Sequence, residues 1–427
     1  MNNKLARLFN KSFVRNIIIM STGTIAAQAI SLLLTPIITR IYGPESYGLM
    51  GVFIAIMGVV TPIAALTYPI AIVLPKKNKE AQSLAQLSIY ISIGLAILVL
   101  LILCFFKQFI VRLFNIEEIS PYLFLIPVVI LCAGFFQVME QWLIRTKQFG
   151  ISAKVAFSQS LLVNGAKTGL GYLHPFATTL IILSSINEGI RAIMMLVFSK
   201  KTGKPLPFQF TKLLSLKTTA KKYEDFPLFR APQVLLNAFS DNMPVLLLSV
   251  FFGPASAGFY TLCRSVLKVP SNLIGKSIGD VFYPRISEAK NNGENLTKLI
   301  RKAILLLGAV GIIPFGVIVA FGPWLFTFIF GAGWEVAGEY ARWISLWMFF
   351  NFTYQPCIRA LPVLSAQGFH LIFTVLTLLV QTSNIIIGYY IFSSDLVIIA
   401  LFGSSGAILC IVLILITLRI SKKVGCS

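Results

Sequence analysis

A row of basic residues in an apolar stretch is the feature of this sequence most suited to binding chemistry. In the segment GFYTLCRSVLKVPSNLIGKSIGDVFYP, the residues Arg264, Lys268 and Ser271 follow one another at intervals of four and three. On a helix turning 100° per residue they share one face, which Asn272 and Lys276 extend sideways. Guanidinium and ammonium groups bind phosphate and carboxylate oxygens. The row therefore predicts a helix face that contacts an anion.

Other charged residues also interrupt apolar stretches. Three more are basic, namely Lys167, Arg191 and Arg342, and the deep carboxylates are Glu188 and Asp241. A basic residue at the centre of a membrane helix costs roughly 2.5 to 3.5 kcal/mol, so a partner or a function must offset it. We take all six basic residues as candidate substrate contacts. A carboxylate can carry a proton or bind Na⁺, which makes both acids candidates for ion coupling.

Structural alternatives exist for most of these residues. Lys167, Lys276 and Arg342 lie near the ends of their apolar stretches, where a long side chain can reach the membrane surface. Glu188 has Arg191 three residues later and is expected to pair with it. We expect Arg264 and Lys268 to be unpaired within the protein; the alternative is that Asp241 pairs with one of them as a structural contact.

The elements that must position these residues are membrane helices. The chain of 427 residues is 57% hydrophobic and only 12% charged, with a mean hydropathy of +0.84. Apolar stretches of roughly 20 residues, enough to cross a bilayer, recur along it. The sequence predicts an all-α polytopic membrane protein with twelve spans, at 14–39, 47–73, 83–106, 121–145, 153–171, 176–198, 229–251, 257–280, 299–322, 338–361, 368–392 and 395–419. The apolar segment 324–330 is too short to cross and is expected at the membrane interface.

The distribution of charge sets the orientation. The net charge is +21, and most Lys and Arg residues fall in alternate loops, those on the side of the N-terminus. By the positive-inside rule both termini are cytoplasmic. A signal peptide is not expected, because the first apolar stretch is long and polar residues interrupt it. The excess positive charge is explained by these loops, so nucleic acid is not an expected partner.

A repeated turn divides the chain into two halves. The stretches IYGPESYGLM and FFGPASAGFY share the pattern G-P-x-S-x-G, starting at Gly43 and Gly253. Proline fixes φ and glycine permits positive φ, which suits a tight connection between helices. We expect six-helix halves at 1–198 and 229–427 in parallel orientation around a central cavity. The basic linker 199–228 between them is expected to be either an amphipathic helix on the anionic inner leaflet or a solvated connection.

These residues carry a resemblance to a known family. The segment RNIIIMSTGTIAAQAISLLLTPIITRIYGPESYGLMGVFIAIMGVVTPIAALTYPIAIVLPKKNKEA resembles the start of the Wzx-type polysaccharide (O-antigen) flippases, and SVFFGPASAGFYTLCRSVLKVPSNLIGKSIGDVFYPRISEA is similar to their seventh and eighth helices. This family is a branch of the multidrug/oligosaccharidyl-lipid/polysaccharide exporter superfamily. At the end of the second helix, where many relatives have an acidic or polar residue, this chain reads Thr67-Tyr68-Pro69.

The resemblance implies a function in polysaccharide or lipopolysaccharide biosynthesis. It implies transfer of an oligosaccharide on undecaprenyl diphosphate across the bacterial cytoplasmic (inner) membrane, by alternating access and without hydrolysis. The implied partners are this lipid-linked oligosaccharide, membrane lipid, H⁺ or Na⁺ as coupling ion, a polysaccharide polymerase and a chain-length regulator. No cofactor, metal or catalytic residue is implied. The cationic cavity of the family would correspond to Arg264 and Lys268, and then to Arg191, Lys276, Lys167 and Arg342.

Two alternatives compete with this function. An exporter of lipid II, of another anionic lipid or of drugs within the same superfamily would have a similar architecture. A membrane polymerase or glycosyltransferase would need an acid, base or nucleophile outside the bilayer, and the short outer loops offer few such residues. The sequence contains no nucleotide-binding loop or metal-binding cluster. We therefore expect a transporter rather than an enzyme.

Overall fold

The structure is almost entirely helical. The computed structural model describes residues 11–114, 116–203, 205–207, 213–271, 282, 285–290, 292–364 and 366–425. Within these ranges every regular element is a helix, as the all-α prediction requires. Eight of the described helices are long and apolar enough to cross a membrane. The chain is thus a multi-pass membrane protein, and large apolar side chains such as Phe105, 79% exposed, cover its outer surface.

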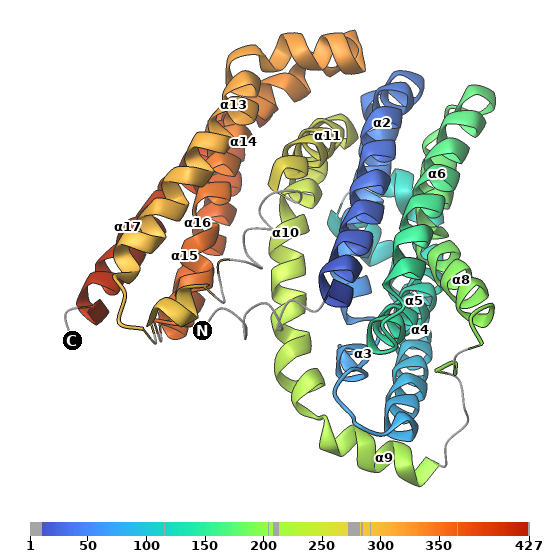
Figure 1. Cartoon of the computed structure of the whole chain (residues 1–427). Helices are drawn as coiled ribbons and strands as arrows, with labels where there is room; N and C mark the ends of the chain where they lie inside the picture. The colour runs from blue at the N-terminus through green and yellow to red at the C-terminus, as the bar shows by residue number, and fades with distance from the viewer. Residues whose placement is uncertain are drawn as a thin grey trace. The chain divides into compact units, whose positions relative to one another are not determined.

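The chain forms two compact units, Met1–Val250 and Phe251–Ser427. The helices of the first unit are α2 (Lys11–Val60), α3 (Tyr68–Ala71), α4 (Asn78–Phe114), α5 (Ile126–Arg145), α6 (Phe149–Leu173), α7 (Ala177–Ser185), α8 (Asn187–Lys200), α9 (Leu213–Lys222) and α10 (Ala231–Phe252). Here α2 packs along α6, and α5 packs against both α4 and α8 (Figure 1). By its packing, most of α10 belongs to the first unit. The expected division of the chain at 199–228 rests on the sequence repeat and stays a prediction.

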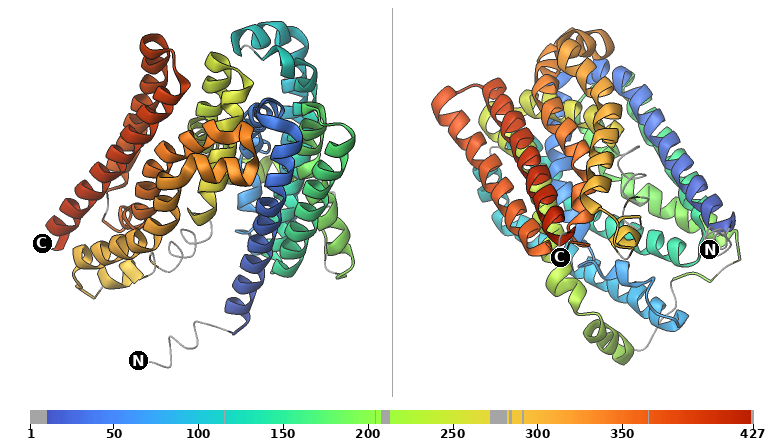
Figure 2. Two further views of the ribbon diagram at one scale, coloured as in Figure 1. Left: turned by 90° about the horizontal axis from the view of Figure 1, so that it is seen from above. Right: turned by 60° about the vertical axis from the view of Figure 1, so that its left-hand side comes forward.

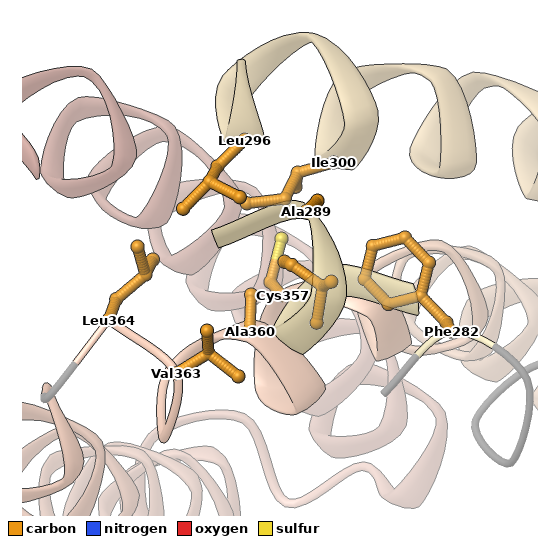
Figure 3. Packing of buried hydrophobic residues seen from close by; sticks show 9 residues of the cluster. Phe282, Ala289, Leu296, Ile300, Cys357, Ala360, Val363 and Leu364 are labelled. Carbon is orange, nitrogen blue, oxygen red and sulfur yellow. The ribbon is translucent and has the colours of Figure 1, made fainter. Parts of the chain in front are cut away.

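The second unit is built around a four-helix group. Its helices are α11 (Pro254–Pro270), α13 (Leu296–Phe330), α14 (Glu335–Thr353), α15 (Gln355–Ala360), α16 (Gln367–Phe392) and α17 (Asp395–Gly425). α13 packs on α14, α14 on α17, and α17 runs beside α16 (Figure 2). At one end of this group, Phe282, Leu296, Ile300 and Cys357 belong to a buried apolar cluster that joins α13 to α15 (Figure 3).

The expected spans overlap helices throughout, but the count of twelve stays a prediction. α2 covers the first expected span and the second as far as Val60, as one helix interrupted at Gly43. α6 is among the more polar of the long helices, since it carries two lysines together with Gln159 and Asn164. α13 also differs from expectation: it continues without a break to Phe330. The segment 324–330 is therefore part of this long helix, because Pro323 does not end it.

The two glycines of the repeated turn have the same unusual backbone. Gly43 has φ 69° and ψ 175°, and Gly253 has φ 87° and ψ 177°. A helix starts at the proline that follows each of them, Pro44 and Pro254. Residues with a Cβ essentially do not adopt this conformation. The two copies of the motif thus make the same turn, as the sequence predicted.

Replacing either turn glycine with alanine is expected to lower stability by about 1 to 3 kcal/mol. No atom lies within 4 Å of a Cβ built at Gly43 or Gly253, so the cost arises from backbone strain rather than from a clash. Gly94→Ala in α4 is a matched control. A Cβ at Gly94 also meets no atom within 4 Å, but the backbone there is helical, a conformation that alanine adopts without strain. Thermal unfolding of the purified variants in detergent measures the difference. Unchanged unfolding temperatures for both turn variants would contradict the assignment.

The linker between the expected halves docks on the first unit. Leu216 and Thr219 of α9 are buried, and α9 packs against α4. The Tyr68 hydroxyl donates to Ala220 O at 3.1 Å, and Thr67 Oγ1 donates to Phe226 O at 2.9 Å. In Figure 1, α9 lies across the ends of α3 and α4. The buried face of α9 therefore packs on protein. The linker contains a helix, as one of the two expectations has it, and its location at the inner leaflet stays a prediction.

Polar contacts hold the linker in place on both sides of α9. The amine of Lys222 donates a hydrogen bond to Glu80, which raises the pKa of Lys222. Ahead of α9, Trp142 Nε1 donates to Pro205 O at 2.9 Å. Phe208 and Phe210, which contribute to the apolar character of the linker, lie outside the described residues.

Candidate functional site

A cavity of about 510 Å³ lies inside the first unit. Its walls come from α2, α6, α7 and α8, together with Thr61 just after α2. This volume is within the roughly 300 to 1,000 Å³ typical of small-molecule sites. The cavity is therefore large enough for a ligand rather than for water alone.

Three of the predicted site residues line this cavity. Lys167 comes from α6, and Glu188 and Arg191 come from the first turns of α8. The expected pair forms, with Arg191 Nη1 lying 3.7 Å from Glu188 Oε2. The guanidinium of Arg191 also stacks on Phe136, 4.2 Å from the ring centroid. These contacts fix the orientation of Arg191 at the cavity wall.

Lys167 is held differently. Among the described residues, its amine contacts a single weak acceptor, Met50 Sδ, at 3.7 Å. Among the residues that the structure describes, no carboxylate lies within salt-bridge distance of this amine. The backbone of Lys167 is fixed by the Tyr42 hydroxyl, which donates to Lys167 O at 2.8 Å. The lysine thus presents a charge to the cavity that the described carboxylates leave without direct compensation.

Neutral polar groups join α2 to α6 at the cavity. Asn164 Nδ2 donates to Ser31 Oγ at 3.0 Å and to Ser160 O at 2.9 Å. Ser160 Oγ donates to Ala27 O at 2.8 Å. The helices approach closely because Gly23 has no side chain: a Cβ there would lie 2.5 Å from Ala153 Cβ. The close packing and the hydrogen bonds together make this wall rigid.

A second polar chain joins α6 to α8. Gln159 Nε2 donates to Asn187 Oδ1, and Asn187 Nδ2 donates to Glu188 Oε1 at 3.3 Å. Four buried polar atoms of the cavity residues have no hydrogen-bond partner among the described residues: Gln28 Oε1, Ser184 Oγ, Glu188 Oε2 and Arg191 Nε. Buried polar atoms are normally satisfied, but these four have almost no accessible surface, so a ligand in the cavity would contact them only after a side-chain rotation.

The neutral residues of this cavity were not among the predicted site residues. Their signal is nevertheless present in the spacing. Gln28 and Ser31 are three residues apart, and Ser160, Asn164 and Lys167 follow at intervals of four and three. Each set lies on one face of its helix. Polar residues repeating on one face of an apolar span would have identified both walls.

The basic row that contains Arg264, Lys268 and Ser271 belongs to the second unit. Arg264 and Lys268 are half-buried on α11. Both have interaction partners, as does Asp241, so the expectation that Arg264 and Lys268 are unpaired is wrong. Asp241 is exposed on α10. The row forms as predicted as far as Ser271, and Lys276 lies outside the described residues.

Arg342 makes its contacts within the second unit. Its Nη1 atom lies 3.2 Å from Glu339 Oε1, one turn earlier on α14. Its Nη2 atom donates to Ala320 O of α13 at 3.2 Å. Arg342 thus ties α14 to α13 within the second unit, and its charge is compensated by Glu339.

The fold is similar to that of solved membrane proteins. A multidrug resistance MATE family transporter of the MOP superfamily, in an inward-facing conformation, matches with a TM-score of 0.71 and 15% identity, covering 92% of this chain and 95% of that chain. The lipid II flippase MurJ, in an inward closed conformation, matches with a TM-score of 0.71 and 14% identity, covering 96% of this chain and 90% of that chain. At these identities the likeness concerns the fold.

The family is established by sequence. Residues 37–339 match the model of a family described as polysaccharide biosynthesis protein. The match covers well over half of the chain, and the chain belongs to this family. No curated protein matches the sequence. By their names, the two solved structures described above are a multidrug resistance transporter and a lipid II flippase.

Proposed function

We propose that this protein is a flippase for an oligosaccharide carried on undecaprenyl diphosphate. It moves the oligosaccharide unit of an O-antigen or related surface polysaccharide from the inner to the outer leaflet of the bacterial cytoplasmic membrane, with both termini in the cytoplasm. The family match and the transporter fold support this function. The observation that carries it is the polar cavity inside the first membrane unit.

The cavity supports transport because polar groups within a membrane protein are costly. Lys167, Glu188 and Arg191 lie on membrane helices and line one cavity, together with amides and hydroxyls. These polar side chains contribute less to stability than apolar packing would. Binding of a ligand therefore explains their presence best. A lipid-linked oligosaccharide needs a polar path for its head while its tail stays in the bilayer.

Two further features belong to the proposal. Arg264 and Lys268 of α11, both half-buried, would be further substrate contacts, and so would Lys276, which follows them in the sequence. Glu188 and Asp241 would serve ion coupling by H⁺ or Na⁺, since a carboxylate can bind either. Arg342 is a weaker candidate, because Glu339 already compensates its charge.

The charge of the cavity helps to distinguish between the competing classes of exporter. Two basic residues and one carboxylate line it, which favours a neutral or anionic cargo over a cationic drug. A lipid II exporter has a cargo of similar chemistry. Parallel assays with lipid II and with an undecaprenyl-diphosphate oligosaccharide separate these two functions.

The direct test is flipping in proteoliposomes. A membrane-impermeant probe, such as a lectin or a periodate reagent, reports the glycan that reaches the far leaflet. We expect flipping by the wild type, and a rate at least tenfold lower for Lys167→Met, equivalent to about 1.4 kcal/mol. The charge is removed while the length of the side chain is nearly preserved. Imposed H⁺ and Na⁺ gradients then identify the coupling ion.

The matched control is Lys154→Met. Lys154 lies on the same helix, is exposed, and does not line the cavity. Flipping close to the wild-type rate by this variant is expected. Absence of flipping by the wild type under any gradient, with either lipid-linked substrate, would exclude the proposed function.

A further inference from the structure

A strained turn follows α2 at the edge of the cavity. Pro62, just after α2, has no N–H with which to continue the helix. After a short 3-10 turn (Thr61–Ile63), Leu66 and Thr67 both have positive φ, at 45° and 61°. Bulky and β-branched residues rarely adopt this conformation, and it persists only where surrounding contacts enforce it. The segment 61–67 is therefore under backbone strain.

The first residue of this segment belongs to the cavity wall. Thr61 lines the cavity, as do Met57 and Gly58 in the last turn of α2. Gln137 Nε2 of α5 donates to Thr61 O at 2.7 Å, which holds Thr61 from the side. Because only a short turn separates Thr61 from Leu66, a backbone change at Leu66 would move this part of the wall.

The linker holds the other end of the segment. Thr67 Oγ1 donates to Phe226 O at 2.9 Å, and the Tyr68 hydroxyl donates to Ala220 O at 3.1 Å. Leu66 and Phe226 both pack against the buried apolar cluster that contains Tyr68. Thr67 and Tyr68 stand where many relatives have an acidic or polar residue. In this chain, the two side chains bind the backbone of the linker.

The strain and the linker contacts act in opposite directions. Strain favours a return of Leu66 and Thr67 to an ordinary backbone, whereas the two hydrogen bonds and the packing of Phe226 hold the strained form. The net contribution of such hydrogen bonds is modest, and the cost of a strained residue is of the same order. The free-energy difference between the strained and relaxed forms is therefore small, as a conformational switch requires.

We propose that the segment 61–67 is a hinge in the cavity wall, and that the docked linker is the latch that holds it bent. Release of Thr67 and Tyr68 from the linker lets the hinge relax and changes the shape of the cavity at Thr61. The linker continues into α10, which ends at the boundary between the two units. Movement of the linker is thereby transmitted to the cavity. This inference concerns conformation and does not depend on which cargo the cavity takes.

Hydrogen–deuterium exchange by the full chain in nanodiscs tests the latch. Mass spectrometry follows peptides that cover 61–74 and 213–226. Thr67→Val and Tyr68→Phe each keep the shape of the side chain and remove one hydrogen bond to the linker. We expect each variant to speed exchange about fivefold in both peptides, the effect of one lost hydrogen bond. Unchanged exchange in both variants would overturn the proposal.

Two controls make the same chemical changes elsewhere. Thr377→Val removes a hydrogen bond from Thr377 Oγ1 to Phe373 O within α16. Tyr122→Phe removes the hydrogen bond between the Tyr122 hydroxyl and Thr178 of α7. We expect both controls to leave exchange at 61–74 and 213–226 at the wild-type rate. Equal acceleration by the controls and the latch variants would contradict a specific role for the linker contacts.

A pair of substitutions at Leu66 tests the strain. Leu66→Gly and Leu66→Ala both remove the packing of the leucine side chain, but only glycine adopts positive φ without strain. Glycine therefore stabilises the bent hinge. We expect the 61–74 peptide of Leu66→Gly to exchange about fivefold more slowly than that of Leu66→Ala, in line with the cost of one strained residue. Equal exchange in the two variants would show that no strain is released at Leu66 and would overturn the hinge.

Flipping distinguishes a hinge from a turn that only supports the fold. If the hinge relaxes in each transport cycle, Leu66→Gly flips its cargo about fivefold more slowly than Leu66→Ala, although its bent form is the more stable of the two. A purely structural turn gives the opposite order, and that result would overturn the hinge while the proposed function stands. If the wild type flips no substrate, the proposed function fails, and the exchange measurements still decide the hinge.

Discussion

Gly338→Ala is expected to destabilise the second unit by about 3 kcal/mol, the upper part of the range for overpacking a tight contact. Gly338 of α14 faces the segment Gly322–Pro323 of α13. A Cβ at Gly338 would lie 2.4 Å from Pro323 Cα and 2.6 Å from Gly322 O. Both of these are backbone atoms, so no side chain can rotate to relieve the clash. The two helices would have to separate where Arg342 also joins them.

The measurement is thermal unfolding in detergent, followed by the fluorescence of the protein's five tryptophans. Gly316→Ala is the control, since Gly316 is also on α13 and a Cβ there would meet nothing within 4 Å. We expect the control to unfold at or slightly above the wild-type temperature, because alanine favours a helix over glycine. Equal unfolding temperatures for Gly338→Ala and the control would mean that α13 and α14 do not cross as closely as the structure has them.

Much of the fold follows from the sequence because membrane helices obey simple rules. Hydropathy locates the helices, and the turn glycines Gly43 and Gly253 have the positive φ that the repeated motif predicted. The boundaries were harder to predict. Pro323 suggests a helix end, yet α13 continues through it to Phe330. Docking of the linker depends on contacts between residues far apart in sequence, such as Trp142 with Pro205, which hydropathy does not encode.

The candidate site was predicted in part. The cost of burying charge singled out Lys167, Glu188 and Arg191, which the structure brings to one cavity, and their role as site residues stays a prediction. The same rule also selected Arg342, whose partner Glu339 is visible in the sequence at i−3 and accounts for it. It missed Gln28 and Asn164 because neutral amides carry a smaller insertion cost. Which side chains meet at one cavity depends on how the helices pack, so the cavity itself required the structure.

Ala156→Trp is expected to abolish flipping by filling the cavity. Ala156 lines the cavity on α6, and a bulky indole there would occupy the space that the cargo needs. The neighbouring Phe157 points away from it: its side chain is 43% exposed and is not among the cavity residues. Phe157→Trp therefore introduces the same side chain on the outer face of the same helix, one residue away.

Flipping of an undecaprenyl-diphosphate oligosaccharide by these two variants, in proteoliposomes matched for protein content and unfolding temperature, tests the central claim most directly. The account predicts wild-type rates for Phe157→Trp and a loss of at least a hundredfold for Ala156→Trp, a barrier increase of about 2.7 kcal/mol. Equal, undiminished flipping by a folded Ala156→Trp variant would show that the cargo does not use this cavity and would contradict the account.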